Sequence, residues 1–165
     1  MTSSTPNSVW NIQRKWTLPN RLEAVAQAGR EVFDWLADLP LSSRAKYAAG
    51  LAVEEMATNI VKYGYDDDNE HLIHVTIDIT RDHIIIEFVD DGHAFDPTKQ
   101  PAPDIEKLVH SQKAGGLGIE LVRRISEKMM YQRDDNINRL TLHIRRLEPD
   151  DTQYIKLSQL AQETP

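Results

Sequence analysis

The sequence predicts a single domain of the α/β class, of the α+β kind, in which helices precede and separate antiparallel hairpins. Two stretches between residues 20 and 63 have apolar residues at helical spacing, and two later regions have the patterning of hairpin strands. The length of 165 residues and the apolar content of 40% fit one hydrophobic core. We therefore expect one domain over 9–147, a disordered N-terminus over 1–8 and a C-terminal tail over 148–165.

A strand and a helix are expected first. Val9–Leu18 contains β-branched and aromatic residues in rough alternation and is followed by Pro19, which is typical of a strand that ends there. Asn20 followed by Glu23 resembles a capping box, and apolar residues then recur every three to four positions. This pattern predicts a helix that runs to about Asp38.

A second helix is expected after Pro40. Ser42 or Ser43 can cap its N-terminus, and Gly64 can be the residue that follows its C-terminus. Its apolar positions form one stripe: Ala45, Ala49, Ala52, Val53, Met56, Ile60 and Tyr63. This helix carries the first chemical motif.

Two hairpins and a third helix complete the predicted elements. Leu72–Thr80 and His83–Val89 alternate with period two and are joined by a short link, so they predict an antiparallel hairpin. A mobile loop is expected next, over Asp96–Ala114, with at most one or two helical turns near Ile105–His110. A helix over Leu117–Met129 follows it. The closing strands are Tyr131–Arg133 and Arg139–Leu147, around a turn at Asp134–Asn138.

Composition excludes several functions. The chain has no cysteine, so it has no disulfide, thiolate zinc site or cysteine nucleophile. No apolar run approaches the roughly 18 residues that a membrane span needs, and Met1–Asn7 is short and polar, so we expect a cytoplasmic protein without membrane contact. The net charge of −7 repels a phosphate backbone, so nucleic acid is not an expected partner.

Glu55 and Asn59 are the first candidate site residues. They are four residues apart on the second predicted helix, so they share a face at the border of its apolar stripe. A carboxylate and an amide there can serve a metal ion, or a base beside a metal ligand, because Mg²⁺ prefers oxygen donors. Taken alone, such a pair is more often solvated surface.

The second motif, Asp90-Asp91-Gly92-His93-Ala94, begins where the second strand of the first hairpin ends. Small residues allow another group to approach the backbone, and a carboxylate at a strand end can accept a hydrogen bond from an amino group such as that of adenine. In isolation, an ordinary Asp-Gly turn is the more frequent explanation.

The third motif is A-G-G-L-G at 114–118, immediately before the third predicted helix and just after Lys113. Backbone N–H groups at a helix N-terminus, with no side chains in the way, form an anion site for phosphates. A tight loop explains a glycine cluster at such a place as often.

The order of the three motifs is more specific than any one of them. E-x-x-x-N on a helix, a hairpin ending in D-x-G-x-A, a loop and then G-G-L-G before a helix together indicate a nucleotide site. The chain has no G-x-x-x-x-G-K-[ST] and no G-x-G-x-x-G after a first strand. The P-loop and the dinucleotide-binding fingerprint are therefore excluded.

With these motifs the sequence resembles the GHKL, or Bergerat-fold, superfamily over about residues 41–145. Glu55–Asn59 corresponds to its N box, Asp90–Ala94 to its first glycine box and Gly116–Gly118 to its second. The segments EEMATNIVKYGY, DDGHAFDP and GGLGIELVRRI most resemble the compact anti-sigma-factor serine/threonine kinases of bacterial partner-switching systems. The resemblance implies a histidine-kinase-like ATPase fold: a two-layer sandwich with helices on one face of a mixed, mainly antiparallel sheet.

The resemblance also implies ATP and Mg²⁺ as cofactors and a role for each motif. Asp90 is expected to bind the adenine amino group, with Gly92 and Ala94 shaping the pocket. Asn59 is expected to hold Mg²⁺. Glu55 is the expected general base that takes the proton from a protein serine or threonine hydroxyl.

The remaining expected site residues are on the lid, the third helix and the last strand. Gly116, Leu117 and Gly118 are expected to face the phosphates with their backbone, and Lys113 to reach the terminal phosphate from the lid. Thr141 occupies the place where the family often has a hydroxyl near adenine. A strand residue that packs on its neighbours explains Thr141 equally well.

The function implied is that of an ATP-dependent, anti-sigma-factor-type serine/threonine kinase. Its expected partners are a sigma factor or similar regulator and a STAS-domain antagonist, which it phosphorylates; a homodimer is left open. One alternative is an ATP-dependent binding module with little or no kinase activity, which would not need Glu55. Another is a detached histidine-kinase catalytic domain, which would need a partner with the acceptor histidine. His93 and His110 are expected to be structural or surface residues.

Overall fold

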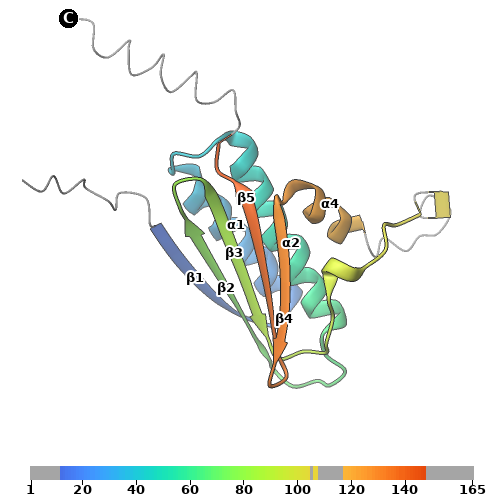
Figure 1. Cartoon of the computed structure of the whole chain (residues 1–165). Coiled ribbons are helices and arrows are strands. Elements are labelled where there is room, and N and C mark those ends of the chain that lie inside the picture. Colours follow the sequence, from blue (N-terminus) through green and yellow to red (C-terminus); the bar gives the residue numbers. More distant parts are fainter. Residues whose placement is uncertain (1–11, 105, 108–116, 148–165) are drawn as a thin grey trace, which may run out of the picture.

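The computed structural model of the chain describes residues 12–104, 106–107 and 117–147. Within them, five strands form one sheet in the order β1-β2-β3-β5-β4, and all four pairings are antiparallel. Three helices cover one face of this sheet (Figure 1). The predicted two-layer arrangement is therefore confirmed.

The strands and helices follow the predicted order. The strands are β1 (Ile12–Pro19), β2 (Leu72–Ile79), β3 (His83–Asp90), β4 (Lys128–Asp134) and β5 (Ile137–Arg145). The helices are α1 (Leu22–Ala37), α2 (Ser43–Tyr63) and α4 (Leu117–Ile125), with a short 3-10 turn, η1, at Pro97–Lys99. Ser42 caps α2, because its side chain accepts a hydrogen bond from Ala45 N at 3.0 Å.

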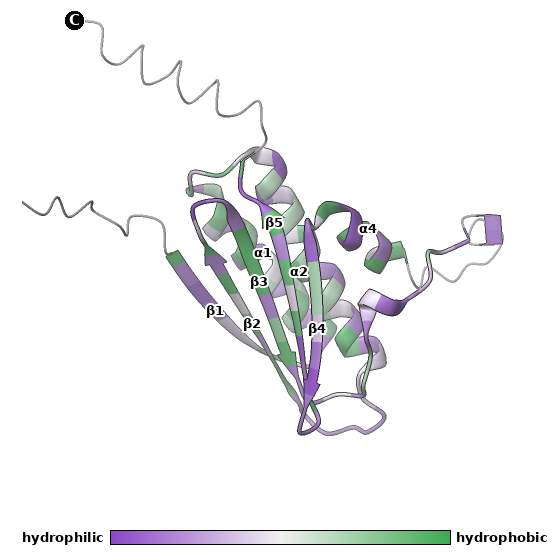
Figure 2. Ribbon diagram, in the orientation of Figure 1, coloured by the Kyte–Doolittle hydropathy of each residue, from purple (hydrophilic) through white to green (hydrophobic). Residues whose placement is uncertain are grey.

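The core lies between the helices and the inner face of the sheet. Alternate residues of each central strand point into it, which gives those strands their period-two pattern (Figure 2). On β3 and β5 these inward residues are Ile84, Ile86, Phe88, Leu140, Leu142 and Ile144. Helix α2 packs against α1, α4, β3 and β5, so its residues are central to the molecule.

Two predicted boundaries are wrong, and tertiary contacts explain both. Asn20 does not cap α1: the N-cap is Arg21, and the Asn20 side chain instead accepts from His71 N at 3.0 Å. The third helix ends at Ile125 and not at Met129, because Met129 pairs with Leu142 in the antiparallel β4–β5 ladder. Strand pairing overrides the apolar spacing that suggested a longer helix.

The closing hairpin has a shorter turn than predicted. Asp135 and Asn136 have φ of 45° and 64°, so they form a two-residue turn of the kind that requires positive φ at both central positions. Asn138 is therefore not part of the turn. It lies in β5, which begins at Ile137, and its side chain is buried on the inner face of the sheet.

Some predictions fall on residues outside the described ranges. These concern the start of the first strand at Val9, the helical turns at Ile105–His110 apart from residues 106–107, which are helical, and Lys113, Gly116 and both tails. No helix in the described part of the chain combines the length and apolar character needed to cross a membrane.

Candidate functional site

A cavity of about 350 Å³ lies between α2, the start of α4 and the ends of β3, β4 and β5. Apolar side chains form most of its wall: Met56, Ile60, Tyr63, Phe95, Pro97, Ile119, Tyr131 and Leu140. The polar residues that line it are Asn59, Asp90, His93, Gln100 and Asn138. A mostly apolar recess of this size with a few convergent polar groups is typical of a small-molecule site.

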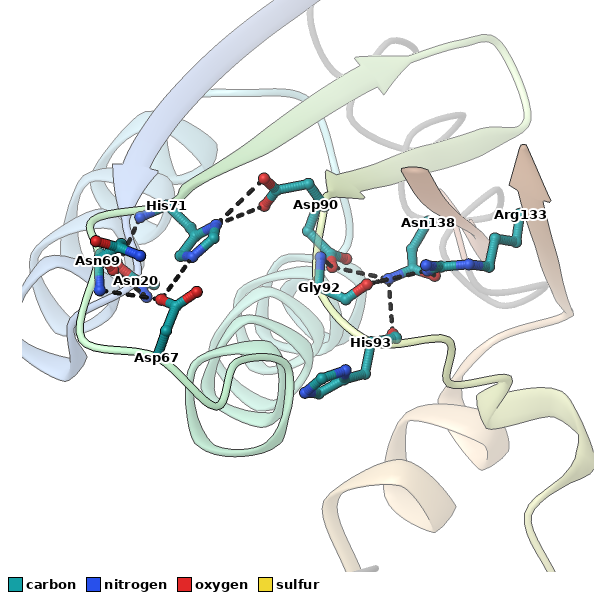
Figure 3. Close-up of polar contacts among 10 residues, drawn as sticks. Asn20, Asp67, Asn69, His71, Asp90, Gly92, His93, Arg133 and Asn138 are labelled. Atoms are coloured by element: carbon teal, nitrogen blue, oxygen red, sulfur yellow. Dashed lines mark hydrogen bonds and ion pairs between the residues drawn. The ribbon is translucent and has the colours of Figure 1, made fainter. Parts of the chain in front are cut away.

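Asp90 is the buried carboxylate of this cavity. It ends β3 on the inner face of the sheet, and its Oδ1 accepts hydrogen bonds from Gly92 N and Asn138 Nδ2, each at 2.9 Å (Figure 3). Burial raises the pKa of Asp90 above its ordinary value, although the hydrogen bonds from Asn138 and Gly92 act against this shift. The side chain is thus held in place by donors on one oxygen.

Gly92 is needed because the chain passes close to the end of α2. A Cβ added at Gly92 would lie 2.7 Å from Gly64 O and 2.9 Å from Asp90 Oδ1. The adjacent His93 N donates to Gly64 O at 2.8 Å. Ala94, which was expected to shape the pocket, is exposed and does not line the cavity.

Asn59 lines the cavity from α2 and has an unusual feature. Its Nδ2 atom is buried and has no hydrogen-bond partner among the described residues. A buried amide N–H without a partner costs free energy, so an acceptor on a ligand or a water molecule would bind favourably to Nδ2. One turn earlier on the same helix, Glu55 lies half-buried at the side of α4.

Glu55 contacts the first turn of α4. A Cβ added at Gly118 would overlap Glu55 Oε2, so the carboxylate occupies the space of the missing side chain. The first N–H groups of a helix have no partner within it, so this turn can bind an anion. Leu117, which precedes Gly118, has an exposed side chain. The structure therefore brings the first and third motifs into contact.

Arg123 connects α4 to the segment that follows the first glycine box, Asp90–Ala94. Its Nη2 donates to Pro97 O at 2.8 Å and to Gln100 O at 2.9 Å, and its Nη1 bonds Glu120 at 2.9 Å. The described beginning of the predicted loop is thus attached to the helix that opens with the glycine motif.

Thr141 lies on the wrong face of the sheet for the expected role. It pairs with Glu87 of β3 and Met130 of β4, whereas its neighbours Leu140 and Leu142 point to the inner face. Because side chains alternate along a strand, Thr141 points away from the cavity. Thr141 is thus not among the residues that line the cavity.

Asn138 is the polar residue of β5 that lines the cavity beside Asp90, and the sequence interpretation missed it. Its Nδ2 bonds Asp90, and its Oδ1 accepts from Tyr131 Oη and Arg133 Nη1, both at 2.6 Å. The alternation of Leu140, Leu142 and Ile144 points Asn138 inward. This signal was hidden because residues 134–138 were assigned to a turn.

A second polar cluster joins the segment after α2 to Asp91 in the first glycine box. His71 lies between Asp67 and Asp91, with ring-nitrogen to carboxylate distances of 2.9 and 3.1 Å (Figure 3). Its ring also stacks on that of Tyr65, at 4.2 Å between ring centres. Hydrogen bonds that the ring donates to the Asp67 carboxylate, and then to that of Asp91, raise the pKa of His71. His93 pairs with Asp66 at 2.8 Å, so it links the same two segments.

The chain is similar to known proteins in both sequence and fold. A sequence model of the histidine kinase-like ATPase domain matches residues 18–144. The serine/threonine-protein kinase BtrW of Bordetella bronchiseptica is 30% identical over 125 residues, which are 73% of this chain and 88% of that protein. The serine-protein kinase RsbW of Oceanobacillus iheyensis is 32% identical over 85 residues, which are 47% of this chain and 51% of that protein.

Two solved structures share the fold. The structure of the RsbU and RsbW domains of Rv1364c from Mycobacterium tuberculosis aligns with a TM-score of 0.58 and 15% identity, over 81% of this chain and 32% of that one. The SiaB-SiaC complex from Pseudomonas aeruginosa aligns with a TM-score of 0.50 and 16% identity, over 80% of this chain and 89% of that one.

Proposed function

The chain belongs to the histidine kinase-like ATPase domain family, and we propose that it is an ATP-dependent protein serine/threonine kinase of the anti-sigma-factor type. ATP binding is implied by the family. The protein kinase activity is supported by the similarity to two kinases that act on serine or on serine and threonine. The proposed partners are a sigma factor or similar regulator and a STAS-domain antagonist that receives the phosphate.

One observation carries this proposal: two carboxylates lie at two different places in the site, one where a nucleotide base can be buried and one where its phosphates can be bound. Asp90 lies in the apolar cavity, where a base can be buried. Glu55 lies against Gly118 at the opening turn of α4, where backbone N–H groups favour phosphates. A module that only binds a nucleotide has no use for the second carboxylate.

The polar groups present fit an adenine nucleotide with Mg²⁺. The Asp90 carboxylate can accept a hydrogen bond from an amino group, and Asn59 lines the same cavity with an amide oxygen of the kind that can take part in holding Mg²⁺. Gly118, with Gly116, Leu117 and Lys113 from the preceding segment, is proposed to hold the phosphates. Bound ATP supplies the phosphoryl group that is transferred.

Glu55 has the proposed catalytic role. A carboxylate beside the phosphate-binding turn can orient a serine or threonine hydroxyl of the protein substrate and take its proton. Gly118 leaves the space in which this carboxylate lies. The side chain of Glu55 is only half-buried, so a hydroxyl from a second protein can reach it.

Incubation with γ-labelled ATP, Mg²⁺ and a candidate STAS-domain protein tests the proposal. We expect label on a serine or threonine of the STAS protein, and we expect none with Glu55→Gln. Label on a histidine of a partner would instead favour a detached histidine-kinase domain. ATP-dependent binding of the partner without any transfer would favour a binding module.

A further inference from the structure

Asn138 is the centre of a network that joins the closing hairpin to the end of β3 (Figure 3). Its Oδ1 accepts from Tyr131 Oη and Arg133 Nη1, both at 2.6 Å. Its Nδ2 faces three acceptors: Asp90 Oδ1 at 2.9 Å, His93 O at 2.9 Å and Gly92 O at 3.2 Å. The side chain is buried, with 5% of its surface exposed.

These neighbours leave one orientation for the Asn138 amide. The guanidinium of Arg133 can only donate, so it must face the amide oxygen. The carbonyl oxygens of Gly92 and His93 can only accept, so they must face the NH₂ group. The NH₂ group has two hydrogens, and the nearest acceptors are Asp90 Oδ1 and His93 O, both at 2.9 Å, so Asp90 Oδ1 receives an N–H from Asn138.

This orientation determines which oxygen of Asp90 is available. Oδ1 already receives the N–H groups of Gly92 and Asn138, each at 2.9 Å. A proton on Oδ1 itself would therefore face two donors and no acceptor. None of the described residues donates a hydrogen bond to Oδ2. The network thus occupies Oδ1 and leaves Oδ2 for a ligand in the cavity that Asp90 lines.

We infer that Asn138 is a positioning residue that keeps Asp90 as a hydrogen-bond acceptor toward the cavity and so selects purines with an amino group at position 6. This inference rests on the proposed nucleotide site and adds the residue that determines which base it takes. A carbonyl at position 6, as in inosine, would place a second acceptor against Oδ2. Because a polar site rejects a ligand that leaves its buried group unpaired, ATP is expected to bind about 100-fold more tightly than inosine triphosphate.

Other charged groups near Asp90 set the pH range of this selection. Burial and the adjacent Asp91 raise the pKa of Asp90, while Asn138, Gly92 and the charge of Arg133 lower it. Tyr65 faces it from the segment after α2 and stays neutral, because burial and the charges of Asp90 and Asp91 raise the pKa of its hydroxyl. Wild-type affinity for ATP should therefore fall in acid and be constant toward alkaline pH.

The decisive variant is Asn138→Asp, which has nearly the same shape. Its carboxylate still accepts from Tyr131 and Arg133, but it can donate to Asp90 Oδ1 only when it is protonated. Its affinity for ATP should therefore fall as pH rises, opposite in direction to wild type. In mildly alkaline solution we expect a loss of about 10-fold or more and a smaller preference for ATP over inosine triphosphate.

Asn136→Asp is the matched control. It adds the same charge to the same hairpin, two residues away, on an exposed side chain that does not contact Asp90. Dissociation constants of both nucleotides are measured from pH 5 to 9 for the three proteins, so that titration of the nucleotides themselves cancels. A pH profile of Asn138→Asp parallel to those of wild type and Asn136→Asp would overturn the inference.

A nucleotide-free measurement separates this inference from the proposed function. The Asp90 carboxyl is titrated by ¹³C NMR in wild type and in Asn138→Ala, which lacks the donor and is small enough to be accommodated. We expect the midpoint to move to higher pH in the variant; an unchanged midpoint would overturn the positioning role whether or not ATP binds. A shifted midpoint in a protein that binds neither nucleotide would overturn the proposed ATP site, and the base selection with it.

Discussion

The carboxylate of Glu55 lies in the space that a side chain at position 118 would fill. A Cβ built on Gly118 overlaps Glu55 Oε2, and the next atoms that it meets also belong to Glu55. Glu55 of the E-x-x-x-N motif and Gly118 of the G-G-L-G motif are therefore complementary in shape. Their separation by more than 60 residues in the sequence conceals this contact.

Gly118→Ala should lower phosphoryl transfer without loss of stability. The new methyl group displaces the Glu55 carboxylate, and a misplacement of about 1 Å can cost about 100-fold in rate. Alanine is the better helix former, so the melting temperature should be unchanged or higher. The control is Gly29→Ala in α1, where an added Cβ meets nothing within 4 Å. Equal kinase rates for the two variants would show that the Glu55 position is unimportant.

Asp90→Asn should weaken ATP binding. The amide loses the negative charge that strengthens the hydrogen bond from the adenine amino group, which is worth about 1.5–3 kcal/mol, or roughly 10- to 150-fold in affinity. Isothermal titration calorimetry measures the change. Asp91→Asn removes the same charge one residue along the chain, from a side chain that pairs with His71 and does not line the cavity. If both variants bind ATP like wild type, Asp90 is not at the base.

Local patterning predicted most of the fold. Period-two alternation located β2 and β3, and a serine cap located the start of α2, because both signals arise from the residues of the element itself. Asn20 was misjudged because its side chain bonds to the backbone of His71, far away in the sequence. Such a contact leaves no periodic signal.

The site was predicted less completely than the fold, and one turn explains the difference. A five-residue turn over 134–138 removes Asn138 from its strand, and Thr141 was named only from the resemblance to the family. The observed two-residue turn at Asp135 and Asn136 restores the alternation, which directs Asn138 inward and Thr141 outward. Side-chain direction depends on register, so a small error in turn length changes which residues face the cavity.

His71 should make the stability of the domain depend on pH. Its pKa in the folded protein is raised by Asp67 and Asp91, so the protonated form is favoured by folding. That contribution is complete below the pKa of an unfolded histidine and is lost as pH rises through the higher folded value. Urea denaturation should show that His71→Asn destabilises the protein more in mildly acidic than in alkaline solution. His74→Asn, whose ring bonds the Thr17 hydroxyl, is the control, and parallel pH profiles would contradict the prediction.

Arg146→Met should destabilise the fold and leave the site intact. Arg146 is buried, and its guanidinium donates to Pro40 O, Thr80 O and Arg81 O, which joins the connection between α1 and α2 to the β2–β3 turn. Loss of these charge-assisted hydrogen bonds should cost about 1.5–3 kcal/mol in the free energy of unfolding. Arg145→Met breaks an exposed ion pair with Glu127 and should cost less than about 1 kcal/mol. Equal losses in denaturant melts would contradict this reading of Arg146.

Glu55→Ala should separate ATP binding from phosphoryl transfer. Asn59, one turn away on α2, and the backbone of the α4 turn remain, so affinity for ATP should stay near that of wild type. The substrate hydroxyl loses the carboxylate that orients it and accepts its proton, so transfer should fall by about 10²–10⁴-fold, the usual contribution of a general base. Binding of the regulator should persist, because the proposed binding surface depends on bound ATP and not on turnover.

Glu54→Ala is the matched control for this prediction, because Glu54 is the exposed neighbour of Glu55 on the same helix. Single-turnover transfer to the STAS-domain protein and ATP affinity are measured for both variants and for wild type. Loss of transfer in both variants would indicate that negative charge on this part of α2 affects binding of the STAS-domain protein, and not that Glu55 acts as a base. Full transfer in Glu55→Ala would leave Glu55 as a polar residue at a helix border, whose contact with Gly118 concerns packing and not chemistry.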